Sequence, residues 1–83
     1  MANVTVRFFA RYAELTGRES AAIVVPGNSA TVADVLECVR ETIPGARDLP
    51  PRPLTAVNLQ QVKPDARVRD GDEVALLPPL AGG

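Results

Sequence analysis

The chain is 83 residues long, which is enough for one domain with one modest hydrophobic core and leaves no room for a second domain. Hydrophobic residues make up 46% of it and charged residues 23%, a balance that argues against a disordered or fibrous chain. Nine basic and ten acidic residues give a formal net charge of -1, and the arginines are scattered rather than clustered, so no nucleic acid partner is expected.

The sequence also lacks the features of membrane and secreted proteins. No run approaches the roughly 18 apolar residues of a spanning helix, and the first residues do not form a basic stretch followed by an apolar one. Small domains from oxidising compartments usually carry several cysteines, whereas Cys38 is the only cysteine here. We therefore expect a cytoplasmic protein with no membrane partner.

Self-contained catalysis is not expected from this composition. The chain has no histidine, so it cannot build a Ser/His or Cys/His nucleophile pair. Asp70, Asp72 and Glu73 lack the spacing of a calcium loop and are typical of a solvated turn, so we expect no metal site. Cys38 falls among apolar helix positions and is expected to be an inert, partly buried residue. We expect no bound cofactor.

The first predicted elements are a strand, a short helix and a second strand. Apolar and polar residues alternate through residues 3–10, which is the period of a strand with one face in a core. Residues 11–16 are good helix formers and are followed by Gly17, a residue suited to a left-handed cap. The β-branched run at 21–25 ends at a Pro-Gly turn signal and predicts a strand paired with the first.

The main helix is predicted over residues 32–43. Its apolar residues recur at the i, i+3, i+4 and i+7 positions that place them on one helix face. Thr31 precedes this stripe and Asp34 stands three residues later, a variant of the capping box. Pro44 and Gly45 should end the helix.

A loop and short strands complete the predicted fold. Residues 44–53 contain four prolines and are expected to form an exposed loop, because proline fits neither a helix interior nor a paired central strand. Residues 54–59 are a strand candidate, with a brief edge pairing near Val62. The turn at 69–72 leads into a last strand over 73–77. This order predicts an α+β fold of the β-grasp kind, in which a mixed sheet of four to five strands wraps around one main helix.

The end of the chain is expected to be an extended tail over residues 78–83, attached to a domain over 1–77. Pro78 and Pro79 favour an extended backbone, so six residues could reach about 20 Å beyond the sheet at about 3.3 Å per residue. Gly82 and Gly83 have no side chains, so a narrow channel could admit them and bring the terminal carboxylate to a buried reactive centre.

Several motifs resemble one known family. They are Phe8-Phe9-Ala10 with Glu14-Leu15 and Gly17, Thr31-Val32, Ala56-Val57-Asn58, and Asp70-Gly71-Asp72-Glu73-Val74-Ala75 leading to Pro78-Pro79-Leu80-Ala81-Gly82-Gly83. In these motifs, over nearly its whole length, the chain resembles the small subunit of molybdopterin synthase, in the group of ubiquitin-like sulfur carriers that also contains the thiamine-pathway carrier. The terminal motif is the most specific of them.

The resemblance implies a function for the chain end. A separate ubiquitin-activating-type adenylyltransferase would adenylate Gly83 with ATP, and a sulfur donor would convert it to a thiocarboxylate. The tail would then enter the molybdopterin synthase large subunit and give its sulfur to a molybdopterin precursor. On this basis the chain is a carrier subunit of a sulfurtransferase complex rather than an enzyme alone.

Alternation along the strands predicts which residues contact these partners. Phe8 and Leu76 should face the helix, which leaves Phe9 and Leu77 on the outer face as a docking patch. We expect Leu59 and Leu80 to extend that patch toward the tail. The expected partner-binding residues are therefore Phe9, Leu59, Leu77, Pro78, Pro79, Leu80 and Ala81, with Gly82 and Gly83 at the reacting end.

Three other functions fit the same residues. The chain could carry sulfur for another pathway, such as thiamine, cysteine or tRNA thiolation, because such carriers can end in similar motifs. It could also be a β-grasp module that only binds other proteins, or a modifier joined to lysines through Gly83. The double proline and the Phe8-Phe9-Ala10 motif favour molybdopterin.

Overall fold

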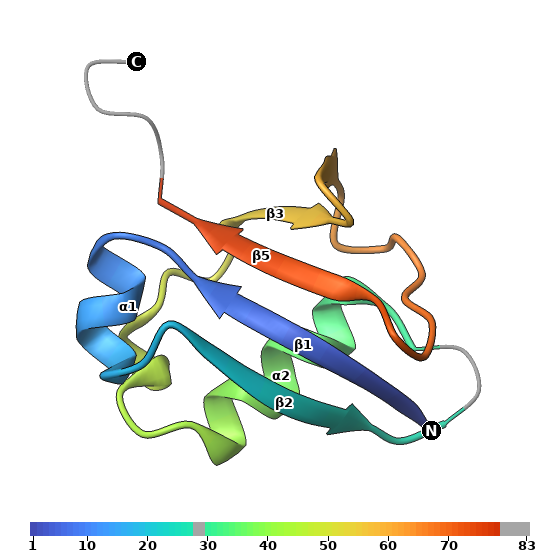
Figure 1. The fold of residues 1–83 in the computed structure, drawn as a ribbon, viewed down its shortest axis with the longest axis horizontal. Coiled ribbons are helices and arrows are strands. Elements are labelled where there is room, and N and C mark those ends of the chain that lie inside the picture. The colour runs from blue at the N-terminus through green and yellow to red at the C-terminus, as the bar shows by residue number, and fades with distance from the viewer. Residues whose placement is uncertain (28–29, 79–83) are drawn as a thin grey trace.

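The structure, a computed structural model, describes residues 1–27 and 30–78. Within them, five strands form one sheet: β1 (Ala2–Phe8), β2 (Ser20–Val25), β3 (Leu54–Val57), β4 (Gln60–Val62) and β5 (Glu73–Leu77). The helical elements are α1 (Arg11–Thr16), α2 (Val32–Thr42) and the 3-10 turn η1 (Ala46–Asp48). The long helix α2 crosses one face of the sheet (Figure 1), and no helix in the described residues has the length and apolar character needed to span a bilayer.

The sheet is mixed, with the strand order β2-β1-β5-β3-β4. The first and last strands lie side by side and run parallel, with Val6 opposite Val74 and Phe8 opposite Leu76. The other neighbouring pairs are antiparallel. This arrangement confirms the predicted β-grasp fold and brings the end of β1 next to the end of β5.

The core lies between α2 and the sheet face that it covers. Alternate residues of β1 point into it, with Phe8 3% exposed and Val6 fully buried. The helix contributes its predicted apolar stripe, and Val35 and Val39 have no exposed surface. Burying an aliphatic side chain of this size stabilises the fold by about 1.5–3 kcal/mol.

The capping residues of α2 act as predicted. Thr31 Oγ1 accepts a hydrogen bond from the Asp34 N–H at 3.3 Å, and Asp34 Oδ2 accepts one from the Thr31 N–H at 2.9 Å. The helix ends at Thr42, one residue before the predicted end, because Ile43 precedes Pro44 and takes an extended conformation.

The prediction of an exposed loop over 44–53 was wrong in part. The segment contains η1, and Ala46, Leu49 and Pro53 are buried. Prolines exclude long regular structure, but they do not prevent the apolar residues between them from covering the end of a core. The loop is therefore held against the core by its buried residues.

Other strand ends differ from the prediction where the backbone turns. The first strand was expected over 3–10, but the chain leaves β1 after Phe8 and Ala10 has a φ of 49°. The strand expected over 54–59 ends at Val57, because Asn58 and Leu59 have φ values of 49° and 73°. A single residue with positive φ cannot continue a strand.

Candidate functional site

The face of the sheet opposite α2 is open. Along β5, Val74 and Leu76 point into the core, so the alternating residues Glu73, Ala75 and Leu77 point to the open face. Ala75 is buried between its neighbours, whereas Glu73 and Leu77 are half-buried and remain accessible to another protein.

Apolar residues gather where β5 ends, with Phe9, Leu54 and Leu77 on this open face and Pro78 directly after Leu77 in the chain. Leu54 of β3 lies opposite Leu77 of β5. Phe9 directly follows Phe8, which lies opposite Leu76. Phe9 is 38% exposed and Leu54 37% exposed, while Leu77 and Pro78 are half-buried. We call these four residues, Phe9, Leu54, Leu77 and Pro78, the tail-base patch.

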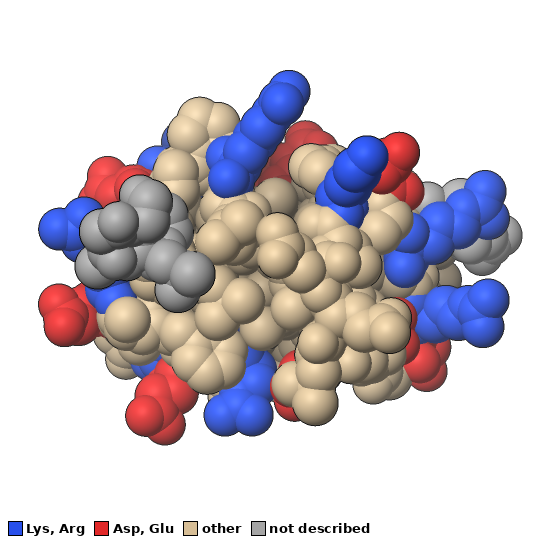
Figure 2. Space-filling view, turned by 90° about the horizontal axis from the view of Figure 1, so that it is seen from above, with Lys and Arg blue, Asp and Glu red and all other residues tan. Residues whose placement is uncertain are grey.

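The edge of the sheet next to β3 has few charged side chains in its middle (Figure 2). Figure 2 views the side of the molecule along which β3 runs, and it shows uncharged surface in the middle with charged side chains around the margin. The uncharged surface in Figure 2 includes polar as well as apolar residues, so it marks an area without charged side chains.

One arginine is held at the border of the tail-base patch. Arg7 forms an ion pair with Glu73 at 3.8 Å, and its guanidinium carbon lies 5.6 Å from the centre of the Phe9 ring. Both charged side chains are nearly half exposed, so the pair adds little stability. Its effect is to orient a cation and the aromatic ring beside the patch.

A hollow lies on the α1 side of the tail base. Its volume is about 470 Å³, and its walls include Tyr12, Leu15, Pro50 and Pro78. The hydroxyl of Tyr12 is buried and has no hydrogen-bond partner among the described residues. Apolar walls beside Pro78 enlarge the surface that a partner could cover at the start of the tail.

The structure describes some of the predicted docking residues and not others. Phe8 and Leu76 are buried, and Phe9 and Leu77 are on the outer face, as predicted. Pro78 adjoins Leu77 at the end of β5. The remaining predicted residues, Pro79, Leu80, Ala81, Gly82 and Gly83, lie outside the described residues.

Leu59 does not extend the patch toward the tail, so this part of the prediction was wrong. It is 89% exposed in the turn between β3 and β4. Because β3 is antiparallel to β5, the chain moves away from Leu77 as it proceeds from Leu54 to Leu59. The strand from Leu54 to Val57 alone spans about 10 Å, and Leu59 follows it in the turn. A separate role of Leu59 in partner binding stays a prediction.

Sequence reasoning missed Leu54 as a member of the patch. Its position was assigned to a strand, but its place opposite Leu77 depends on the pairing of β3 with β5. The register between distant strands could not be read from either segment alone.

The described residues offer little chemistry of their own. Among them, no three His, Cys, Asp or Glu side chains gather as metal ligands. Partial burial raises the pKa of the Cys38 thiol, and the nearby carboxylates of Glu41 and Glu37 raise it further. The thiol therefore stays protonated at neutral pH, which agrees with the predicted inert residue.

The fold and the site define a class of small β-grasp proteins that present an apolar patch at the base of a Gly-Gly chain end. Comparison with known proteins identifies the family within this class. Residues 6–83 match the model of the ThiS family. The chain therefore belongs to the ThiS family.

Relatives of known structure or function agree with this assignment. The chain is 30% identical over 82 residues to the molybdopterin synthase sulfur carrier subunit of Chlamydomonas reinhardtii, covering 96% of this chain and 98% of that protein. It also resembles small archaeal modifier protein 1 of Haloferax volcanii, with 27% identity, a TM-score of 0.83, and coverage of 96% of this chain and 100% of the other.

A third relative was solved together with another protein. Its structure is a complex of subunits 1 and 2 of the molybdopterin-converting factor of Helicobacter pylori. The match has 26% identity and a TM-score of 0.66, and covers 98% of this chain and 99% of that one. Together with the family match, these similarities define the chain as a ubiquitin-like sulfur carrier.

Proposed function

We propose that this carrier delivers sulfur from Gly83 to a molybdopterin precursor within molybdopterin synthase. The observation that carries the proposal is the tail-base patch, which lies on the open face where the last strand ends at Leu77. A partner that covers the patch would receive the following residues of the chain directly. The relative from Chlamydomonas, a molybdopterin synthase sulfur carrier subunit, supports the choice of pathway.

The proposed chemistry takes place at the terminal carboxylate of Gly83. One carboxylate oxygen attacks the α-phosphorus of ATP and releases pyrophosphate, which gives an acyl adenylate. Hydrosulfide from a sulfur donor then attacks the acyl carbon, and AMP and a proton leave, which gives a thiocarboxylate. A carboxylate is a poor electrophile, and the adenylate provides the leaving group that the sulfur displaces.

The partners would supply the catalytic side chains for these steps. We propose a ubiquitin-activating-type adenylyltransferase for activation and the molybdopterin synthase large subunit for transfer, both in the cytoplasm. Pro78 and Pro79 would direct the tail, and Gly82 would give it clearance in a narrow channel. Leu80 and Ala81 would contact the channel wall. The Helicobacter complex of subunits 1 and 2 supports the second of these partners.

Intact mass measurement tests the carrier step. The chain would be incubated with its activating enzyme, a sulfur donor and ATP, beside a matched chain that lacks Gly83. We expect a mass increase equal to the replacement of one oxygen by one sulfur in the full chain only. If the full chain is unchanged while the enzyme forms adenylate on another carrier, the proposal is wrong.

A second assay tests the acceptor. The thiocarboxylated chain would be mixed with the molybdopterin synthase large subunit and cyclic pyranopterin monophosphate. We expect the dithiolene to form while the chain returns to its carboxylate mass. Loss of the thiocarboxylate without dithiolene would contradict this acceptor and favour another sulfur pathway.

The likeness to a small archaeal modifier protein favours a second candidate function. In that case Gly83 would form an amide bond with a lysine of another protein. Adducts that carry the chain on lysine residues in an extract of its own host would support it, and their dependence on Gly83 would be checked with the shortened chain.

A further inference from the structure

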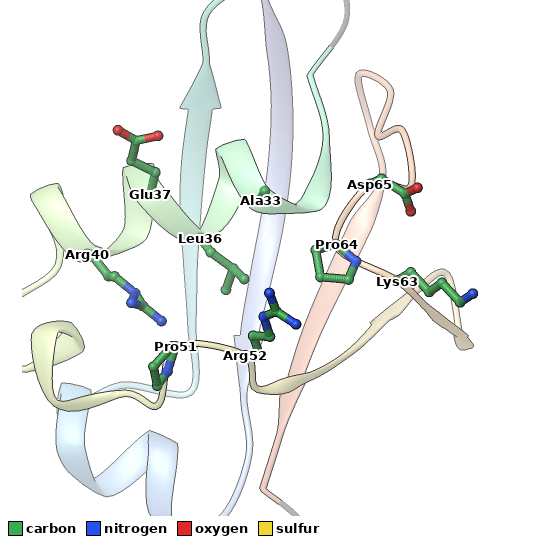
Figure 3. A pocket seen from close by; sticks show the side chains of 9 residues that line it. All are labelled: Ala33, Leu36, Glu37, Arg40, Pro51, Arg52, Lys63, Pro64 and Asp65. Carbon is green, nitrogen blue, oxygen red and sulfur yellow. The ribbon is translucent and has the colours of Figure 1, made fainter.

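A second hollow lies on the opposite side of the molecule from the open sheet face. Its volume is about 640 Å³, and it is bounded by α2, by the loop at 51–52 and by the segment 63–65 (Figure 3). None of its lining residues belongs to the tail-base patch. It is therefore a separate surface of the protein.

The floor and walls of this hollow are apolar. Leu36 of α2 lies at the floor and is 7% exposed. Pro51 and Pro64 line it on the sides away from the helix (Figure 3). Because proline has no backbone N–H, these walls offer no main-chain donors to a ligand.

Two arginines project into the hollow. The guanidinium groups of Arg40 and Arg52 point toward its centre, whereas Glu37 points away from it (Figure 3). Arg40 Nη2 donates a hydrogen bond to the carbonyl oxygen of Pro50, which holds this side chain across the loop. The Arg40 Nε–H is buried and has no acceptor among the described residues.

Neither arginine forms an ion pair within 4.0 Å in the part of the chain that the structure describes. The ion pair found within 4.0 Å in the described part of the chain joins Arg7 to Glu73, far from the hollow in the fold. Lys63 adds a third cation at the rim, against the carboxylates of Glu37 and Asp65. The hollow thus presents an excess of positive charge on a chain whose net charge is -1.

We propose that this hollow is a docking site for a segment of a protein partner in which an aliphatic side chain is flanked by carboxylates. The aliphatic group would cover Leu36 between the two proline walls. The carboxylates would accept hydrogen bonds from Arg40 and Arg52, whose planar groups suit this acceptor. A phosphate group fits less well, since the proline walls lack the backbone N–H donors that commonly bind phosphates.

Occupation of this site would leave the tail-base patch free. A partner could therefore hold the protein by α2 while the chain end enters a different protein. This inference does not depend on the sulfur chemistry, because none of the residues that carry it lies in β5 or beyond.

Selection from a displayed library of random peptides on the full chain tests the site. We expect enriched peptides with Asp or Glu beside Leu, Ile or Val. A synthetic copy of an enriched peptide would then be titrated by calorimetry.

Arg52 is exposed, and R52E should weaken binding of this peptide about tenfold or more. The matched control R18E changes an exposed arginine elsewhere and should stay within about twofold.

Three outcomes would overturn the proposal. The first is enrichment of peptides without acidic residues. The second is an enriched acidic peptide whose affinity R52E leaves unchanged, which would place its binding elsewhere. The third is an absence of enriched peptides together with R52E-sensitive binding of ATP, which would make the hollow a site for small anions. Weaker binding of the acidic peptide at high salt would support the proposed contacts.

Discussion

At the scale of single residues, Gly45 fixes the contact between two elements. Its φ is +85°, and a Cβ atom there would lie 2.0 Å from the carbonyl oxygen of Leu15. The start of η1 therefore rests directly on the backbone at the end of α1. Only a residue without a side chain permits both this conformation and this approach.

Replacing Gly45 with alanine should destabilise the protein strongly. The left-handed conformation costs about 1–2 kcal/mol for a residue with a Cβ, and the clash with Leu15 adds about 1–3 kcal/mol. Gly17 is a matched control, because its φ is +71° but no atom lies within 4 Å of an added Cβ. Urea denaturation should show the larger loss for G45A. Equal losses for G45A and G17A would contradict the clash.

Asp70 should make stability depend on pH. The backbone N–H of Asn3 donates a hydrogen bond to Asp70 Oδ1 at 2.8 Å, and the Asn3 side-chain amide donates a second one at 3.0 Å. The backbone bond, followed by the side-chain bond, lowers the pKa of the Asp70 carboxyl group. A lowered folded-state pKa adds stability above the unfolded-state pKa, and this stability is lost as the pH falls through the folded-state pKa.

The substitution D70N tests this dependence. Thermal unfolding should give a lower Tm than the unchanged chain at neutral pH, and the difference should narrow as the solution becomes acidic. D65N serves as a control at an exposed aspartate with no hydrogen bond among the described residues. A difference that stays constant from neutral to acid pH would show that the ionised form of Asp70 has no special role.

At the scale of elements, the capping box stabilises the start of α2. T31A removes the hydroxyl that accepts from the Asp34 N–H, so it should cost about 1 kcal/mol of unfolding free energy. The control T42A lies at the other end of the same helix, where the hydroxyl only donates to the Cys38 carbonyl oxygen. Its effect should stay within about 0.5 kcal/mol. Chemical denaturation compares the two directly.

The elements predicted well are those whose signals are local. The apolar stripe and cap of α2 lie within a dozen neighbouring positions, and the alternation of β1 needs no partner to be visible. The burial of Ala46 and Leu49 could not be seen in this way, because it depends on α1 and α2 packing against η1.

The candidate site was predictable only in part for the same reason. Phe9 and Leu77 follow from alternation along their own strands, and both lie on the outer face. The position of Leu54 beside Leu77 and the distance of Leu59 from it both result from the antiparallel pairing of β3 with β5. That pairing joins two strands that are separated in the sequence by β4 and the turn before β5, and neither strand specifies it alone.

At the scale of the whole molecule, the parallel contact of the first and last strands assembles the site. It places Phe9 beside Leu77 although the two residues lie near opposite ends of the sequence. The same topology puts α2 and its arginine-lined hollow on the other side of the sheet. One small domain therefore offers two surfaces that two proteins could occupy together.

A charge placed in the tail-base patch should separate docking from folding. Leu54 is 37% exposed, so L54E should leave the free energy of unfolding within about 0.5 kcal/mol of the unchanged chain. Its carboxylate would be buried against a partner, so the affinity for the activating enzyme should fall about tenfold or more. V24E is the matched control, since Val24 is 51% exposed on the edge strand β2, away from the tail base.

Calorimetric titration of the activating enzyme with each variant gives the comparison. Weaker binding of L54E with unchanged binding of V24E would locate the docking surface at the tail base. Equal weakening of both would indicate general repulsion by added negative charge, and raising the salt concentration should then restore both. Unchanged binding of L54E would mean that the enzyme recognises the chain end without the patch, because the tail residues are the same in all three proteins.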